Sequence, residues 1–335
     1  MDNKPSGYRS LFWPIVFLGV GILWLLASLN ILPNVNIMSL IAFWPAILII
    51  IGLDLLIGRQ SQLGSAILGG IVVAGLAIIL IASPKINIGT NNQIIHENIS
   101  EPLGSATSAQ IQLNLAEQPT TIDAAANPEN LIEGSIDHTG TLSFEVSGNT
   151  SKTIKLERIQ NPSNWHLGYN LENPKWEIGL NPTIPLDLNI DSGSGSVQLF
   201  LKELTLTHFA IVGGSGSIHL TLPESQTAYS AELESGSGSL EATLPQKTAL
   251  TITLSGGSGS QNIIVPLGAP LRVEVRDSGS GSIHLPDYLK QISGSKENDE
   301  GVWESENYAS AENPILIIVE DHGSGSLRID SLTSF

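Results

Sequence analysis

The chain has 335 residues, a net charge of −17 and no cysteine. This length suits two or three domains, and the absence of cysteine excludes disulfides and thiol chemistry. From Lys85 onward, 12 Lys and Arg residues face 30 Asp and Glu residues, a net charge of −18. Such an acidic region excludes nucleic acid and electrostatic docking onto anionic lipid. Its charge suits the solubility of a repetitive β surface.

Three apolar runs, each about 20 residues long, follow one another near the N-terminus. They cover residues 11–29, 38–57 and 65–83. Each is long enough to cross a bilayer as a helix. The motif Phe-Trp-Pro at residues 12–14 recurs at 43–45, so the first two runs are copies. The sequence predicts a membrane domain over residues 1–84 with three transmembrane helices.

Two features inside these runs are candidates for function. Ala66, Gly70 and Ala74 are spaced by four, which would place small residues on one helix face and favour helix association. Generic lipid-facing Gly and Ala explain the same pattern, so both interpretations stay open. Asp54 is an acidic residue in a membrane segment, but its position near Arg59 favours snorkelling to the interface.

The basic residues of the short loops predict the orientation. Lys4, Arg9 and Arg59 fall on one side of the predicted spans, and only Lys85 opposes them. The positive-inside rule then places the N-terminus inside and, after three spans, the acidic β region outside. We expect a multi-pass protein of the cell membrane, with the lipid bilayer as its first partner.

Residues 85–185 are predicted to form a linker and a β cap. Short alternating runs at 109–115, 131–136 and 141–146 indicate strands. We expect these strands to be antiparallel and to cover the first coil of a repetitive domain, because an uncovered end coil is an open edge. Trp165 and Trp176 lie in a less regular stretch, where they would seal the cap or bind a ligand.

A repeat of Gly-Ser-Gly-Ser corners fills the rest of the chain. The glycine pairs are Gly193/Gly195, Gly214/Gly216, Gly236/Gly238, Gly257/Gly259, Gly279/Gly281 and Gly323/Gly325. The second glycines step by 21, 22, 21, 22 and then 44 residues. A fixed period of this length predicts a solenoid, in which each unit buries its apolar face only by stacking on its neighbours.

Apolar residues alternate with polar ones on both sides of each corner, which excludes helix and indicates strands with one buried face. Leu186, Leu188 and Ile190 precede the first corner, for example, and Val197 and Leu199 follow it. Glycine suits a sharp corner in which backbones approach closely. Residues 186–335 are therefore predicted to form a right-handed parallel β-solenoid (β-helix) with about 21–22 residues per coil.

The register and the final long step lead to two further expectations. Val197, Ile218, Leu240 and Ile283 should stack in one internal column on successive or nearly successive coils. The step of 44 indicates a coil that carries an insertion at about 287–313, or a coil that lost its corner signal. We expect a surface excursion there, with Trp303 and Tyr308 as capping or recognition aromatics.

Acidic residues precede four of the corners: Asp191, Glu234, Asp277 and Asp321. In sequence order they fall on alternate coils, which does not match the adjacent-coil ligands of calcium-binding β-rolls. Hydrogen bonds to the N–H groups of the turn are the simpler explanation, although weak calcium binding stays open. No cofactor or metal site is predicted.

No constellation of residues suits catalysis. His219 and His284 are three coils apart in sequence order, about 14 Å, so one metal cannot bridge them. Arg272 shares its strand with Glu274 and suits a surface ion pair. The Gly-Ser runs are turns rather than nucleophile elbows, and no His/Asp pair accompanies them. The sequence therefore predicts a protein that is not an enzyme.

Three segments resemble known families. The doubled Phe-Trp-Pro hairpin is similar to the membrane region of LiaI- and LiaF-type envelope-stress proteins. The segment 185–188, with the Gly-Ser-Gly-Ser corners that follow it, resembles the toast-rack domain. Residues 302–308, before the last corner, resemble adhesin-like β-solenoid domains. The resemblance implies bacterial envelope-stress sensing or modulation of a two-component system, without catalytic residues.

Two classes of function follow. The first is a membrane-anchored sensor or accessory regulator that acts by protein–protein contact, with a membrane sensor kinase as the kind of partner. The alternative is a surface adhesin-like module that binds cell-wall glycan or other cells. A stripe such as Ala66, Gly70 and Ala74 matters only for the first class.

Overall fold

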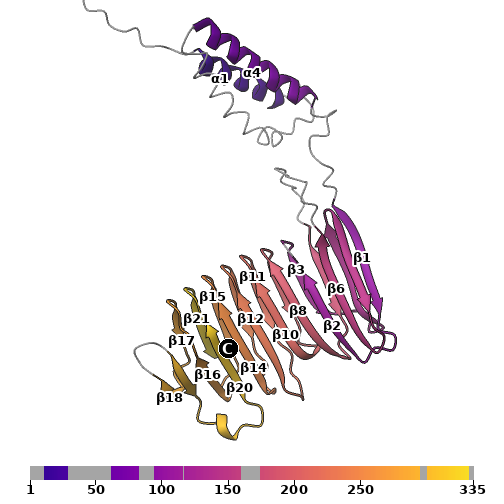
Figure 1. The fold of residues 1–335 in the computed structure, drawn as a ribbon, viewed down its shortest axis with the longest axis vertical. Coiled ribbons are helices and arrows are strands. Elements are labelled where there is room, and N and C mark those ends of the chain that lie inside the picture. Colours follow the sequence, from indigo (N-terminus) through magenta and orange to yellow (C-terminus); the bar gives the residue numbers. More distant parts are fainter. Residues whose placement is uncertain are drawn as a thin grey trace, which may run out of the picture. The chain divides into compact units, whose positions relative to one another are not determined.

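The computed structural model describes residues 11–28, 62–82, 94–115, 117–159, 174–294 and 300–331. The chain divides into a helical unit, residues 1–93 with 162–172, and a β unit, residues 94–161 with 173–335. Figure 1 shows the strands of the β unit stacked side by side, with β1 at one end of the stack and β18 at the other.

The first and third apolar runs form helices α1 (Phe12–Ser28) and α4 (Gln62–Ala82). Pro14 lies in the first turn of α1, where a missing N–H group breaks no hydrogen bond. The two helices pack together where Gly19 faces Val73 and Gly69 lies against Ile15. Within the described ranges, no helix combines the length and apolarity that a membrane crossing requires. The second apolar run lies outside the described residues, so the count of three spans stays a prediction.

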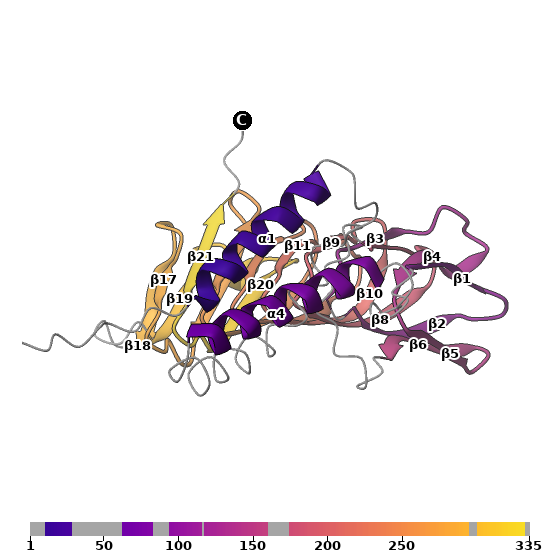
Figure 2. The same ribbon diagram turned by 90° about the horizontal axis from the view of Figure 1, so that it is seen from above.

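The described residues of the β unit form two sheets, which Figure 2 shows side by side. The first sheet has ten strands. In spatial order they are β1 (Ile95–Pro102), β4 (Asn130–His138), β7 (Trp176–Leu180), β3 (Thr120–Ala124), β9 (Val197–Phe200), β11 (Ser217–Thr221), β13 (Ser239–Thr243), β15 (Ser260–Val265), β21 (Ser326–Ser331) and β17 (Ser282–His284).

The second sheet has eleven strands within the same described residues. In spatial order they are β18 (Lys290–Gly294), β19 (Gly301–Glu304), β16 (Leu271–Val275), β20 (Ile315–Asp321), β14 (Leu250–Gly256), β12 (Tyr229–Ser235), β10 (Thr205–Gly213), β8 (Pro185–Gly193), β2 (Ser108–Asn114), β6 (Ser151–Ile159) and β5 (Thr141–Ser147). A short 3-10 helix, η2 (Tyr308–Ser310), precedes β20.

Each coil contributes one strand to each sheet, and from β8 onward a Gly-Ser corner joins the two strands of a coil. Burial alternates along the strands as the sequence predicts, and the inward residues of both sheets form one core. The pairing of Val197 with Ile218 and of Ile218 with Leu240 confirms the predicted internal column. Ile283 belongs to the same column, which continues from Leu240 through the buried polar Gln261 and Leu327.

The C-terminal end does not stack in sequence order. The last coil, β20 with β21, lies between β14/β15 and β16/β17. The predicted insertion is therefore not a simple surface excursion. Its strands β18 and β19 form an antiparallel hairpin, and β19 pairs with β16, where Trp303 lies opposite Val273. This hairpin occupies the outer edge of β16, which leaves the inner side of β16 for the last coil.

The N-terminal end has the same inversion. The expectation of antiparallel strands is met by β1, β4 and β5. It is wrong for β2, which pairs in parallel with β6 and β8, and β3 likewise pairs in parallel with β7 and β9. The first coil in sequence, β2 with β3, is thus covered by the later strands β6 and β7. At both ends of the β unit, the coil that is first or last in sequence therefore lies one coil inside the end of the stack.

Engineered disulfides test the inverted order at the C-terminal end, because the chain has no cysteine of its own. Ser260 pairs with Ser326, and Ser326 pairs with Ser282. Neighbouring parallel strands lie about 4.8 Å apart, within the Cα–Cα range of a disulfide. We expect the double variant Ser260→Cys/Ser326→Cys to form an intramolecular disulfide in mild oxidant, detected by mass spectrometry.

The matched control is Ser260→Cys/Ser282→Cys. These two positions are neighbours if coils stack in sequence order, and they are two coils apart, about 10 Å, in the structure. We expect no crosslink in this variant. Crosslinking of Ser260→Cys/Ser282→Cys and not of Ser260→Cys/Ser326→Cys would show that the inverted order is wrong.

Leu220 tests the register of the core. Its side chain is buried between those of Leu199 and Ala242 on the neighbouring coils. Leu220→Asp places a carboxylate without a partner in this column, and we expect a loss on the order of 4 kcal/mol in the free energy of unfolding. His219→Asp, at the adjacent exposed position, should leave the denaturation midpoint within the usual range of a surface change. Equal midpoints for the two variants would contradict this register.

Candidate functional site

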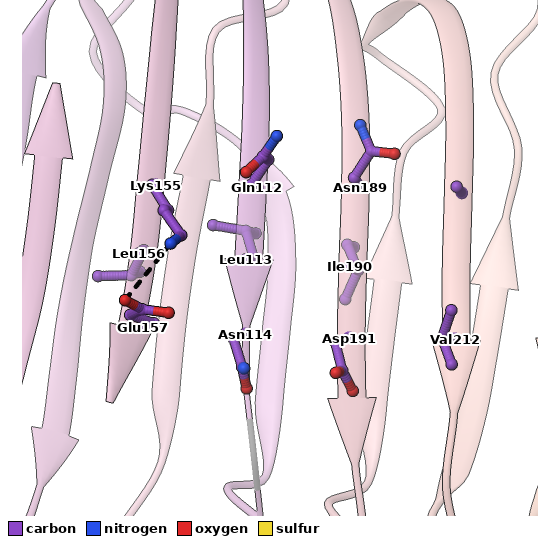
Figure 3. Close-up of a pocket in the computed structure, with 11 residues that line it drawn as sticks. Gln112, Leu113, Asn114, Lys155, Leu156, Glu157, Asn189, Ile190, Asp191 and Val212 are labelled. Atoms are coloured by element: carbon purple, nitrogen blue, oxygen red, sulfur yellow. Dashed lines mark ion pairs between the residues drawn. The ribbon is translucent and has the colours of Figure 1, made fainter. Parts of the chain in front are cut away.

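A shallow groove of about 300 Å³ lies on the outer face of the eleven-stranded sheet (Figure 3). It crosses four neighbouring strands, β6, β2, β8 and β10. The parallel register aligns its outward side chains in two rows. One row is Lys155, Gln112, Asn189 and Ala210, and the other is Glu157, Asn114, Asp191 and Val212. The small Ala210 and the half-exposed Val212 give one side of the groove an apolar floor.

Hydrogen bonds fix part of this lining. Asn189 donates through Nδ2 to Oδ1 of Asp187 at 2.8 Å, and Gln110 donates through Nε2 to Oδ2 of the same carboxylate at 3.3 Å. Lys155 and Glu157 lie 3.5 Å apart as an exposed ion pair. The amides of Gln112 and Asn114 make no side-chain hydrogen bond within the described residues. They therefore present free donors and acceptors to the groove.

The lining of the groove combines hydrogen-bonding groups with an apolar floor. Its described lining has two free amides, a paired lysine and carboxylate, and an apolar floor, but no histidine or hydroxyl nucleophile. Asp191 already accepts the N–H of Gly193 at 3.1 Å, so its carboxylate is used by the corner. Amides next to a small apolar surface are typical of a hydrogen-bonding contact with another molecule.

This groove could not be predicted from the sequence. Gln112 lies beside Asn189, and Asn114 beside Asp191, only because β2 pairs with β8, although the paired residues are 77 apart in sequence. No local motif marks such a pairing. The alternation of residues 109–115 could have shown that these amides face outward, but not which strand lies beside them.

Three of the four corner acids act as predicted. Asp191, Asp277 and Asp321 each accept a hydrogen bond from the glycine N–H two residues on, at 2.8–3.1 Å. Each of these glycines has a positive φ, which is the conformation that this turn requires. Glu234 has no such bond within the described residues.

The order of the corner acids differs from the expectation. They do not all skip a coil, because the inserted last coil places Asp321 next to Asp277. The described residues contain no group of three or more His, Cys, Asp or Glu that could hold a metal ion.

The same inversion corrects the spacing of the two outward histidines. His219 and His284 are separated by Glu241, Asn262 and Arg328, so they lie four coils apart rather than three. His219 approaches Glu241 at 3.7 Å instead. Arg272 forms ion pairs with Glu274 at 3.1 Å and with Glu304 at 3.3 Å. The ion pair with Glu274 is the one expected from the sequence.

The predicted aromatics occupy structural positions where they are described. Trp176 is fully buried in β7, and its indole N–H donates to the carbonyl oxygen of Asp137 at 3.1 Å. Trp303 packs against the core from the capping hairpin, and Tyr308 lies under the guanidinium of Arg272 at 5.8 Å. Trp165 lies outside the described residues. Recognition of a ligand by any of them stays a prediction.

Two groups with shifted pKa values also have structural explanations. A hydrogen bond from the Asn130 side chain, with backbone bonds from Asn127 and Ala126, holds the pKa of Glu133 below its usual value. Burial raises the pKa of Tyr229, whose hydroxyl donates to the carbonyl of Pro223 at 2.9 Å. Each of these two groups fixes a loop. They do not lie together in one pocket, which is where a pair of catalytic groups with shifted pKa values would lie.

The small-residue stripe does not face the other described helix. In α4, the residues against α1 are Gly69 and Val73, whereas Gly70 and Ala74 are exposed and Ala66 is half-buried. A methyl group on Gly70 would meet no atom of the described residues within 4 Å. The role of the stripe stays a prediction.

Comparison with known families agrees with this arrangement. Residues 11–56 match the model of the LiaI-LiaF-like transmembrane region, and residues 88–243 match that of the N-terminal domain of toast_rack, DUF2154. The chain joins a LiaI-LiaF-like transmembrane region to a toast-rack domain. It is a membrane-associated envelope protein, and the resemblance deduced from its motifs is confirmed.

Two solved structures resemble the chain at low identity. A candidate cell adhesion protein from Clostridium sporogenes ATCC 15579 is 15% identical, with a TM-score of 0.47, over 71% of this chain and 100% of its own. A candidate adhesin from Bacteroides fragilis NCTC 9343 is 9% identical, with a TM-score of 0.27, over 72% and 100%. No curated protein matches the chain.

Proposed function

We propose that this chain is a non-catalytic envelope-stress sensor or accessory regulator, similar to LiaF-type proteins, that acts by protein–protein contact. The observation that carries the proposal is the order of its parts: a LiaI-LiaF-like transmembrane region at 11–56 precedes a toast-rack domain at 88–243 in one chain. The partner we propose is a membrane sensor kinase.

Two surfaces of the chain support contact with other proteins. In the helical unit, Gly70 and Ala74 are exposed on α4 away from α1, and such small residues let a further helix approach closely. In the β unit, the groove offers the free amides of Gln112 and Asn114 on β2, with the apolar Val212 two strands away on β10. We propose that the helix face meets a membrane partner and that the groove contributes the contact outside.

The finer topology belongs to the same proposal. We propose three membrane spans, with the N-terminus inside and the acidic toast-rack domain outside, and a right-handed sense for the coils. Lys4, Arg9 and Arg59 support this orientation, and the right-handed preference of parallel crossovers supports the handedness.

Single cysteines test the topology in the full chain. Ser258 is an exposed corner residue of the β unit, and Ser6 precedes the first predicted span. We expect a membrane-impermeant maleimide to label Ser258→Cys in intact cells, and to label Ser6→Cys only after the membrane is permeabilised. Labelling of Ser258→Cys only after permeabilisation would favour an even number of spans.

The regulatory role predicts that the groove transmits the signal. In a host that carries the chain, deleting it should change the output of a reporter for envelope stress under a wall-targeting antibiotic by several-fold. We expect the groove variant Asn114→Lys/Asn189→Lys to reproduce the deletion, because two long cations obstruct the amide surface. The readout is reporter activity at matched amounts of membrane-inserted protein.

The control is Thr251→Lys/Thr253→Lys, which adds the same charges to outward positions of β14 on the same sheet, outside the groove. It should behave like the unchanged protein. A reporter that ignores the deletion would overturn the regulatory role. A reporter that responds to the deletion but not to Asn114→Lys/Asn189→Lys would overturn the groove alone.

A further inference from the structure

Two positions of every Gly-Ser corner are always serine, one after each glycine of the pair. The described corners contain two columns of these residues, one running Ser194, Ser215, Ser237, Ser258, Ser324 and Ser280, and the other Ser196, Ser217, Ser239, Ser260, Ser326 and Ser282. All but the half-buried Ser217 are exposed. We call these two columns the serine strip. Part of it lines a shallow groove of about 640 Å³ along four neighbouring coils.

Close packing explains the glycines between these serines. A side chain at Gly238 would overlap the carbonyl oxygen of Gly216 on the next coil, and Gly259 faces Gly238 in the same way. Packing does not explain the serines, because their side chains point to solvent. The outward position two residues after each strip serine of the second column varies freely: Gln198, His219, Glu241, Asn262, Arg328 and His284.

Turn chemistry does not explain the serines either. Serine is common in turns because its hydroxyl bonds to nearby backbone groups. Here the described strip hydroxyls make no such bond: Ser324 donates to Ser258 at 3.3 Å, across neighbouring coils, and the others have no side-chain partner. The turn amides are instead satisfied by carbonyls of the next coil and, at three corners, by the aspartates.

The strip is also neutral within a strongly acidic domain. It has no charged residue, although the chain from Lys85 onward has a net charge of −18. A neutral surface with such surroundings does not attract an anionic polymer. Each hydroxyl both donates and accepts a hydrogen bond, so it can pair with the hydroxyl of a ligand in either direction. The pairs recur at the rise of the coils, about 4.8 Å.

We propose that the serine strip binds an uncharged, extended glycan that lies along the solenoid axis. One pair of serines on each coil exchanges hydrogen bonds with the sugar hydroxyls. Single contacts of this kind are weak against water, so affinity depends on several coils acting together. This inference goes beyond the proposed regulatory role and uses a different surface. It requires only that the toast-rack domain lie on the side of the membrane where glycans occur.

The test uses the full chain in detergent micelles and two insoluble probes, chitin particles and peptidoglycan sacculi stripped of anionic polymers. We expect both probes to retain the unchanged protein, and soluble N-acetylglucosamine oligomers to release it. Ser237→Ala/Ser258→Ala/Ser324→Ala removes hydroxyls from three neighbouring coils without adding bulk. Retention should fall about tenfold, with an unchanged circular dichroism spectrum.

The matched control removes three outward hydroxyls elsewhere: Thr221→Ala/Thr243→Ala/Thr253→Ala. It should be retained like the unchanged protein. Equal retention of the serine and threonine variants overturns the proposal, as does the absence of retention by both probes. Release by an anionic polymer but not by the neutral oligomers also overturns it. None of these results depends on the stress reporter, so glycan binding and the regulatory role are tested independently of each other.

Discussion

The close approach of backbone at the corners is the constraint on which the β unit depends. Gly238 lies against the carbonyl of Gly216, and Gly259 lies against that of Gly238, with no room for a side chain between them. This contact holds successive coils at one spacing, so the strands of both sheets pair in parallel and in register. The inward residues then stack in columns. Phe209, for example, lies between Leu188 and Ala231 on the two neighbouring coils.

A solenoid built this way must protect its two ends, and here the chain does so by inverting the order of its coils. At each end the terminal coil lies one level inside, because a later or earlier segment covers it with parallel strands. Antiparallel strands follow only beyond this covering segment. A terminal coil normally unfolds first, because only one neighbour holds it. In this chain β20 and β21 can leave only if β16 and β17 also move. His322 adds to this, since its buried ring lies against Gly256 and Gly281 on the two neighbouring coils.

The local features of the fold could be predicted from the sequence, but the order of its parts could not. Alternation predicts the strands, and the glycine period predicts the corners, because both depend on near neighbours in sequence. The order of the last coils is different: Ile315 pairs with both Leu250 and Leu271, so the same apolar pattern would let β16 stack directly on β14. The coil of β2 and β3 could not be predicted, because its corner lacks the Gly-Ser motif. The groove depends on this coil, so it could not be predicted either.

The same geometry that makes the domain regular limits what its surface can do. On stacked parallel strands, outward side chains such as Gln112 and Asn189 point in nearly the same direction and form rows along the sheet. They offer a flat array of donors and acceptors. Such an array suits a partner that is itself flat or extended, because every added coil adds a contact without any change in shape. Both proposals for this chain use this property, since each assigns binding to side chains that repeat along the coils.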